Sequence, residues 1–377
     1  MKAVISAYAR SPFHFAKKGA LANVRPDTMA AEVVKGLLER TGLDPALIED
    51  VILGCAYPEA SQGNNLARIV GLLAGLPVEV GGMTVNRFCG SSMQAIHIAA
   101  AQIEAGIGEA YLCVGVESMT MVPQGGMNFS PSPELLEHSD AYISMGETAE
   151  NVAERWKVSR ADQEALAVQS HRKAAEAREQ GRLKDEIVPI RNADGELISD
   201  DGCIRPTTSA EALAALRPVF RENGVVTAGT SSPLTDGAVA VLVTTDEFAL
   251  RHNLQRMARI KSWATVGVDP AIMGIGPIPA TRKALARAGL KVADLGVVEI
   301  NEAFSSQALA CIRELGLDPA TVNLDGGGLA IGHPLGATGA RITGKAAALL
   351  VRENVKYALA TQCIGGGQGI ATILEAI

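Results

Sequence analysis

The sequence predicts an α/β fold made of two similar halves, with a further domain inserted into the first half. Three observations support this prediction. Apolar residues make up 47% of the 377-residue chain and aromatic residues only 4%, so a large core of small aliphatic side chains can form. Strand-like and helix-like segments alternate through residues 1–117 and again from about residue 259. Two similar segments, GLLERTGL and KALARAGL, occur in the two halves, and the residues of interest that follow each segment lie at similar distances from it along the sequence.

The first half begins with KAVISAYAR, which predicts a strand, and continues with the amphipathic segment DTMAAEVVKGLLERTG. That segment predicts a helix with Asp27 as its N-cap. Further strands are predicted at DVILGCA, MTVNRF and AYLCVGVE, and further helices at NNLARIVGLLAG and SSMQAIHIAAAQIEAG. The last of these helices carries Ala and Ile nearly all the way round, which predicts burial between two layers.

The alternation stops between residues 118 and 234. Loops rich in Met, Pro, Ser and Gly mix there with charged segments such as SRADQEALAVQSHRKAAEAREQG, which we interpret as an inserted domain. A buried strand at GAVAVLVTTD then completes the first half, at about residues 235–258. With the second half at residues 259–377, the pattern predicts a duplicated βαβαβαββ unit. Chance similarity between Ala-rich helices is the alternative.

Composition excludes several classes of protein. The formal net charge of -7 argues against a nucleic acid or an anionic membrane as the main partner, although a few local cations could bind an anionic small molecule. The amino terminus has no apolar stretch long enough for a secretory signal, and no apolar run is long enough to span a membrane. We therefore expect a cytoplasmic protein. The six cysteines form no CxxC pair, which argues against a structural zinc site or a disulfide framework.

Four segments place reactive groups beside glycines at predicted strand ends: NRFCGSS, INEAF, GGGLAIGHPLGATGAR and TQCIGGGQG. Cys89 comes directly before a helix, whose N-terminus favours a thiolate, but a buried inert cysteine would fit as well. His333 stands in a glycine-rich turn and could be structural. Cys363 precedes glycines that could direct N–H groups at an oxyanion. The glycines lack the G-x-G-x-x-G fingerprint of a dinucleotide site.

In this order, the four segments resemble the thiolase family, and the resemblance covers essentially the whole chain. It implies the thiolase fold, in which two βαβαβαββ halves form a five-layer αβαβα arrangement with an inserted loop domain. It also implies an acyltransferase that cleaves or forms 3-ketoacyl-CoA. CoA and acyl-CoA thioesters would be the substrates, with no metal and no permanently bound cofactor.

The resemblance assigns roles to five residues. Cys89 would be the nucleophile that accepts the acyl group, and His333 would help to deprotonate it. Cys363 would protonate the enolate of acetyl-CoA and later deprotonate the incoming CoA. His333 and a water molecule held by Asn301 would stabilise the enolate. The backbone N–H groups of Cys89 and Gly365 would stabilise the tetrahedral intermediate.

The same resemblance assigns CoA binding to the inserted domain. Ser232 matches a serine near the pantetheine arm, and Arg217 matches an arginine near the nucleotide. Met145, Met273 and Phe304 match residues that line the acyl and pantetheine tunnel. For the two methionines, ordinary core packing is the alternative.

Three segments resemble the degradative 3-ketoacyl-CoA thiolases of fatty acid β-oxidation: Cys89-Gly-Ser-Ser, Thr230-Ser-Ser-Pro and Ser144-Met145-Gly146. A biosynthetic acetyl-CoA acetyltransferase and a non-catalytic thiolase-like acyl or lipid-binding protein are the alternatives. The family implies a homodimer or homotetramer, with tetramer contacts in the loop at residues 119–139. A hydratase/dehydrogenase could be a further partner.

Overall fold

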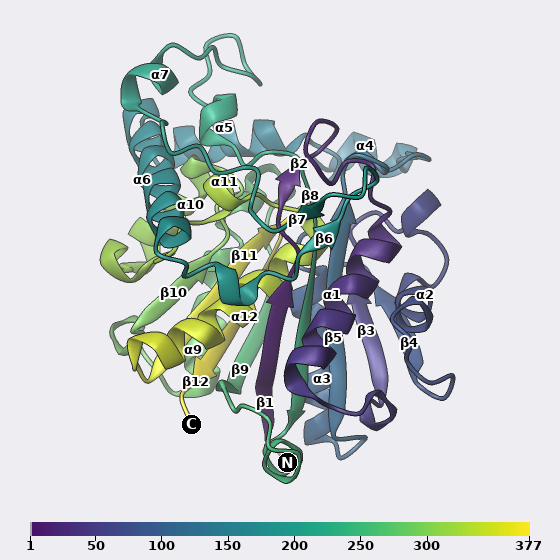
Figure 1. Cartoon of the computed structure of the whole chain (residues 1–377). Helices are drawn as coiled ribbons and strands as arrows, with labels where there is room; N and C mark the ends of the chain where they lie inside the picture. The colour runs from purple at the N-terminus through teal and green to yellow at the C-terminus, as the bar shows by residue number, and fades with distance from the viewer. Residues whose placement is uncertain (1) are drawn as a thin grey trace.

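The computed structural model describes residues 2–377 and shows a large mixed sheet with helices on its faces (Figure 1). The strands are β1 (Ala3–Arg10), β2 (His14–Phe15), β3 (Asp50–Gly54), β4 (Gly81–Val85), β5 (Ala110–Ser118), β6 (Ile190–Arg191), β7 (Leu197–Ile198), β8 (Thr235–Thr245), β9 (Ala258–Gly267), β10 (Val297–Ile300), β11 (Tyr357–Ile364) and β12 (Gln368–Glu375). The helices are α1 (Pro26–Thr41), α2 (Leu66–Leu73), α3 (Ser91–Glu104), α4 (Pro133–His138), α5 (Met145–Arg155), α6 (Arg160–Glu179), α7 (Ala210–Ala214), α8 (Asp246–Arg251), α9 (Pro277–Ala288), α10 (Ser305–Leu315), α11 (Gly328–Ile331) and α12 (Leu335–Glu353).

The strand order repeats between the two halves. In the first half the order is β4, β3, β5, β8, β1, where β5 is parallel to β3 and antiparallel to β8. In the second half it is β10, β11, β12, β9, where β11 is parallel to β10 and antiparallel to β12. Val322 forms a parallel bridge to Val298 on β10, at the position that β4 occupies in the first half. The predicted duplication and the α/β fold class are confirmed.

The helices and the two halves of the sheet form five layers. Figure 1 shows α1 and α2 on the right and α9 and α10 on the left, so each pair covers an outer face. Between the halves lie α3 and α12, and α12 contacts β5 and β8 on one side and β10 and β11 on the other. A short antiparallel pairing of β1 with β9, at Val4 and Ile5, joins the two halves. Three large apolar clusters hold the five αβαβα layers together, one under each outer pair of helices and one around the central helices.

The two central helices pack with their backbones in close contact. A Cβ atom on Gly339 of α12 would lie 2.4 Å from the backbone nitrogen of Met93 in α3. A Cβ on Gly115 of β5 would lie 2.7 Å from the Cα of Ala337 in α12. Both distances are too short for any side chain, so glycine is required where these elements cross. The prediction that α3 is buried between layers is also met, because most of its residues are buried.

One predicted helix start differs from the structure. Arg25 is the N-cap of α1 and Pro26 is its first residue, so Asp27 lies inside the first turn and pairs with Arg25. Proline favours this first position because its fixed φ suits a helix and its missing N–H is not needed there. None of the helices within residues 2–377 combines the length and the apolar composition needed to span a membrane.

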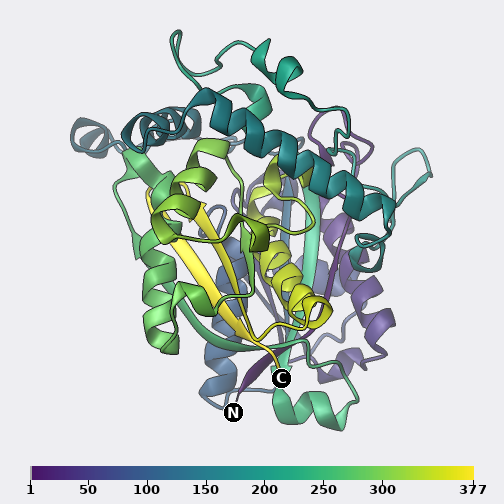
Figure 2. The same ribbon diagram turned by 90° about the vertical axis from the view of Figure 1, so that its left-hand side faces the viewer.

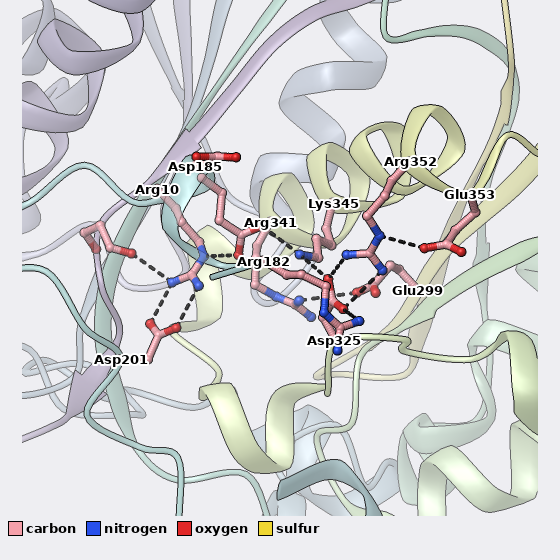
Figure 3. Close-up of polar contacts among 12 residues, drawn as sticks. Arg10, Arg182, Asp185, Asp201, Glu299, Asp325, Arg341, Lys345, Arg352 and Glu353 are labelled. Atoms are coloured by element: carbon pink, nitrogen blue, oxygen red, sulfur yellow. Dashed lines mark hydrogen bonds and ion pairs between the residues drawn. The ribbon is translucent and has the colours of Figure 1, made fainter. Parts of the chain in front are cut away.

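The segment between β5 and β8 contains α4 to α7, β6 and β7, and Figure 2 shows the long helix α6 lying across the top of the molecule. A buried ion network connects this segment to both halves (Figure 3). Arg10 of β1 binds both oxygens of Asp201 at 2.7 Å and Glu186 at 2.8 Å. Lys345 of α12 binds Glu186 at 2.9 Å and Asp325 at 2.7 Å. Glu186 therefore links the first strand of the chain to the last long helix.

We expect the Arg10→Met variant to be destabilised by about 3–5 kcal/mol, because it leaves the buried Asp201 carboxylate without its cation. The thermal unfolding midpoint, measured by calorimetry, should fall by several degrees. Arg172→Met is the control, since its pair with Glu176 is exposed and 3.9 Å long and should contribute about 1 kcal/mol or less. Equal midpoints for the two variants would show that the buried network adds no stability.

Candidate active site

Four loops at the carboxyl ends of strands carry the predicted reactive residues. Cys89 lies between β4 and α3, Asn301 follows β10, His333 precedes α12 and Cys363 lies near the end of β11. The Gln362 side chain donates a hydrogen bond to the Cys89 carbonyl oxygen, so the two cysteine loops adjoin. The two halves of the sheet lie on either side of α3 and α12, and this brings the carboxyl end of β4 in one half near that of β11 in the other.

Cys89 occupies a tight turn. Phe88, directly before it, has a φ of 41°, which is uncommon for a bulky residue. The Ser91 hydroxyl donates to the Phe88 carbonyl at 2.6 Å and accepts the Arg87 N–H at 2.9 Å. These hydrogen bonds hold the turn, and the turn fixes where the Cys89 sulfur points.

The Cys89 thiol is protonated in the resting protein. Burial raises its pKa to about 11, and this effect outweighs the backbone N–H groups of Gly365 and Cys89, which lower it. The N–H groups at this helix start favour a thiolate, as expected, but burial has the larger effect on the pKa. The two N–H groups are nevertheless directed at the sulfur, which makes them donors for charge that develops there.

His333 is neutral, and its hydrogen bonds define which nitrogen carries the proton. Burial, together with the nearby positive charge of Arg341, lowers its pKa to about 3. Its Nδ1 lies 2.6 Å from the Thr338 hydroxyl, which itself donates to the Pro334 carbonyl at 3.0 Å. Because the hydroxyl has only one hydrogen to donate, Nδ1 must carry the imidazole proton. Nε2 is then free to accept a proton.

Cys363 lies in an apolar cluster with Met273 and Phe304, and Met145 packs at the edge of this cluster. Burial raises the pKa of the Cys363 thiol well above its usual range, and the neighbouring Cys89 raises it further. Asn301 is fully buried, and neither atom of its side-chain amide has a hydrogen-bond partner among residues 2–377. A buried amide of this kind needs a ligand or water to satisfy it.

Comparisons with known proteins agree with this arrangement. Residues 3–247 match the family model of the thiolase N-terminal domain, and residues 254–376 match that of the thiolase C-terminal domain. The chain belongs to the thiolase family. A 3-ketoacyl-CoA thiolase of Bacillus subtilis (strain 168) is 46% identical over 99% of both chains, and one of Shewanella sp. (strain W3-18-1) is 49% identical over 100% of both. The crystal structure of human mitochondrial 3-ketoacyl-CoA thiolase covers 100% of this chain and 98% of its own, with 37% identity and a TM-score of 0.91.

These findings confirm the predicted resemblance to thiolases, close to the 3-ketoacyl-CoA thiolases, and the predicted acyltransferase class. The two thiolase residues predicted to bind CoA lie in different settings. Ser232 is half-buried, and its backbone N–H donates to the Ala303 carbonyl at 2.9 Å, beside Phe304. Arg217 is exposed on the turn after α7, and no hydrogen bond or ion pair within residues 2–377 involves its side chain.

Sequence reasoning missed two groups that shape this thiolase site. Thr338 orients His333, and Thr235 accepts the His333 backbone N–H at 3.0 Å. Thr338 could have been noticed, because a hydroxyl in the first turn of a helix can reach back to a side chain just before that helix. Thr235 comes from a distant strand, and nothing in the local sequence indicates its role.

We expect the Thr338→Val variant to lower kcat about tenfold to a hundredfold, because it removes the acceptor that keeps the proton on His333 Nδ1. Steady-state assays with a 3-ketoacyl-CoA should show the loss mainly in kcat, and Thr338→Ser should restore most of it. Thr343→Val is the control, since the Thr343 hydroxyl binds only the Gly339 carbonyl of the same helix. An unchanged kcat in Thr338→Val would contradict the role of Thr338.

Proposed function

We propose that this thiolase cleaves 3-ketoacyl-CoA with CoA, giving acetyl-CoA and an acyl-CoA shortened by two carbons, through an acyl-enzyme on Cys89. One observation carries the proposal: the Cys89 and Cys363 loops adjoin, and two backbone N–H groups are directed at the Cys89 sulfur. The full-length similarity to relatives named 3-ketoacyl-CoA thiolase supports the substrate class.

In the first half-reaction, His333 Nε2 accepts the Cys89 proton while the sulfur attacks the keto carbonyl. The N–H groups of Cys89 and Gly365 stabilise the oxyanion of the tetrahedral intermediate, and one such donor is typically worth about 3 kcal/mol. The Cα–Cβ bond then breaks, which leaves the acyl group on Cys89 and the enolate of acetyl-CoA. His333 and a water molecule on the Asn301 amide stabilise that enolate, and Cys363 protonates it.

In the second half-reaction, CoA takes the acyl group. The Cys363 thiolate, formed when it protonated the enolate, removes the proton from the CoA thiol. The CoA sulfur attacks the acyl-enzyme, and Cys89 leaves and regains its proton from His333. The Cys89 thiol and the His333 imidazole both start neutral because both are buried. A thiolate and an imidazolium therefore form only when a substrate is bound.

We also propose the binding site of CoA. The apolar cluster of Met145, Met273 and Phe304 around Cys363 would line the tunnel for the acyl and pantetheine groups. Ser232 lies beside Phe304, at the place expected for the pantetheine arm. Arg217 is exposed and thus free to meet the phosphates of the nucleotide. A crystal structure of human mitochondrial 3-ketoacyl-CoA thiolase in complex with CoA supports CoA as the ligand.

The residues between 118 and 234 would then act as a CoA-binding domain inserted between the two catalytic halves. The pathway we propose is fatty acid β-oxidation in the cytoplasm. A hydratase/dehydrogenase partner would supply the 3-ketoacyl-CoA. The segments that resemble the degradative subgroup, Cys89-Gly-Ser-Ser and Ser144-Met145-Gly146, support the degradative direction.

A homodimer or homotetramer is proposed as the assembly. β4 is the last strand of the sheet, and the nearby Leu72, Leu73 and Val78 side chains are exposed. A second apolar group is exposed on the loop at residues 119–139, namely Met127, Phe129 and Leu136. Exposed apolar patches beside an unpaired strand edge favour association. Light scattering coupled to size-exclusion chromatography should therefore give two or four times the mass of the chain, and a monomer would contradict the assembly.

A chain-length assay tests the function. Purified protein should cleave acetoacetyl-CoA and 3-ketoacyl-CoA substrates of eight to sixteen carbons, and intact-peptide mass spectrometry should find the acyl group on Cys89. Activity confined to the four-carbon substrate would identify a biosynthetic acetyl-CoA acetyltransferase instead. Binding of acyl-CoA without turnover or adduct would identify a non-catalytic binding protein.

Two variants separate the roles of the cysteines in that assay. Cys89→Ala should lose the adduct and all turnover. Cys363→Ser should still transfer an acyl group from acyl-CoA to Cys89. Its kcat for thiolysis should be at least about a hundredfold lower than that of the wild type, because the enolate lacks its proton donor. An adduct on another residue in the wild type would contradict the assignment of the nucleophile.

A further inference from the structure

Glu117, near the end of β5, is a fully buried carboxylate that lies close to the reactive thiol. No cation forms an ion pair with it within residues 2–377. A buried charge without a counter-ion is costly unless hydrogen bonds compensate for it. Its stabilisation must therefore come from the donors around it.

Those donors belong to two separate parts of the chain. One oxygen of Glu117 accepts the Ala56 N–H and the Gly336 N–H, each at 2.8 Å. The other accepts the Tyr57 N–H at 3.2 Å and the Gln62 side chain at 2.9 Å. Gly336 lies in the first turn of α12, where the helix dipole also favours a negative charge. One carboxylate thus joins the loop after β3 to the start of α12.

Each of these two parts of the chain helps to position one member of the proposed catalytic pair, Cys89 or His333. The Ala56 carbonyl accepts the Asn86 side chain at 3.0 Å, and Asn86 accepts the N–H of Phe88 at 2.8 Å, directly before Cys89. The Tyr57 ring also packs against the Phe88 ring, with 5.8 Å between the centroids.

On the other side, the first turn of α12 includes Thr338, which orients His333. Leu335, at the start of that turn, packs in one apolar cluster with Cys89 and Ala56. A Cβ on Gly336 would lie 2.8 Å from a Glu117 oxygen, so glycine lets the carboxylate reach this backbone. The contacts therefore form a continuous path from Cys89 through Glu117 to the helix that carries the base.

We propose that Glu117 is a positioning residue that fixes the Cys89 loop relative to the start of α12. This role rests on the proposed thiolytic function, in which Cys89 and His333 react together. The reaction rate falls steeply when the distance between a nucleophile and its base changes, by about a hundredfold for a displacement of 1 Å.

Two variants separate the reach of Glu117 from its charge. Glu117→Asp keeps the charge but is one methylene too short to bridge both parts, so kcat should fall about tenfold. Glu117→Gln loses the charge and directs an amide N–H at backbone donors, so kcat should fall about a hundredfold. KM should change less than about threefold in both, because neither variant touches the proposed CoA site.

The pH dependence of Cys89 alkylation by iodoacetamide, read at the Cys89 peptide by mass spectrometry, distinguishes positioning from a purely structural role. The ionisable groups that face Cys89 are Glu117, Cys363, Tyr57 and, in the proposed mechanism, His333. Because Glu117 holds the Cys89 turn in place, both variants should let water reach the thiol and move the alkylation midpoint to lower pH, Glu117→Gln further than Glu117→Asp. Cys55→Ala is the control, because it removes only a weak sulfur donor at 3.6 Å, and its kcat should stay within about threefold of the wild type.

A kcat within about threefold of the wild type in Glu117→Asp, or an unmoved alkylation midpoint in Glu117→Gln, would overturn the proposal. If Glu117→Gln does not fold, as judged by its thermal midpoint, kcat of Glu117→Asp decides the outcome. A wild type that turns over no 3-ketoacyl-CoA would refute the proposed function, and the alkylation comparison alone would then decide the role of Glu117.

Discussion

The close approach of α3 to α12 is the constraint on which the site depends. Glycine at position 339 lets the backbones of the two helices meet, and glycine at position 115 lets α12 rest directly on β5. Cys89 and His333 each come just before one of these helices, so the packing of the helices also sets the distance between the two loops. A nucleophile and its base must stay within hydrogen-bond reach of each other. A rigid contact between two helices keeps them there, because helices hold side chains more precisely than long loops do.

Burial controls the charge state of the site. Burial raises the pKa of the Cys89 thiol to about 11 and lowers that of the His333 imidazole to about 3. The resting pair is therefore neutral, and a thiolate forms only when an electrophile and the N–H donors can share its charge. This arrangement protects Cys89 from solvent oxidants, because the thiolate and not the thiol is the form that reacts with them.

The fold and the main reactive residues could be predicted from the sequence because they leave local patterns. Alternating segments and a register shared by the two halves predict the duplicated βαβαβαββ units, and glycines around Cys89, His333 and Cys363 identify the loops. The N-cap at Asp27 was wrong because Pro26 takes the first helical position. The sequence could not show that burial outweighs the helix N-terminus in setting the pKa of Cys89, because that burial depends on distant parts of the chain. Thr235 and Glu117 had no local signal, since their partners come from other parts of the chain.

The ion network around Glu186 has a consequence for the order in which the chain can fold during synthesis. Glu186 lies between Arg10, which leaves the ribosome among the first residues, and Lys345, which leaves it among the last. The inner face of α3 likewise packs against α12. A nascent chain that ends before α12 therefore exposes the apolar face of α3. Its Glu186 carboxylate also has only one of its two cations, Arg10. The contacts that complete the first half therefore form only after the carboxyl-terminal residues have been made, and exposed apolar surface of this kind is what makes partly folded chains prone to aggregation.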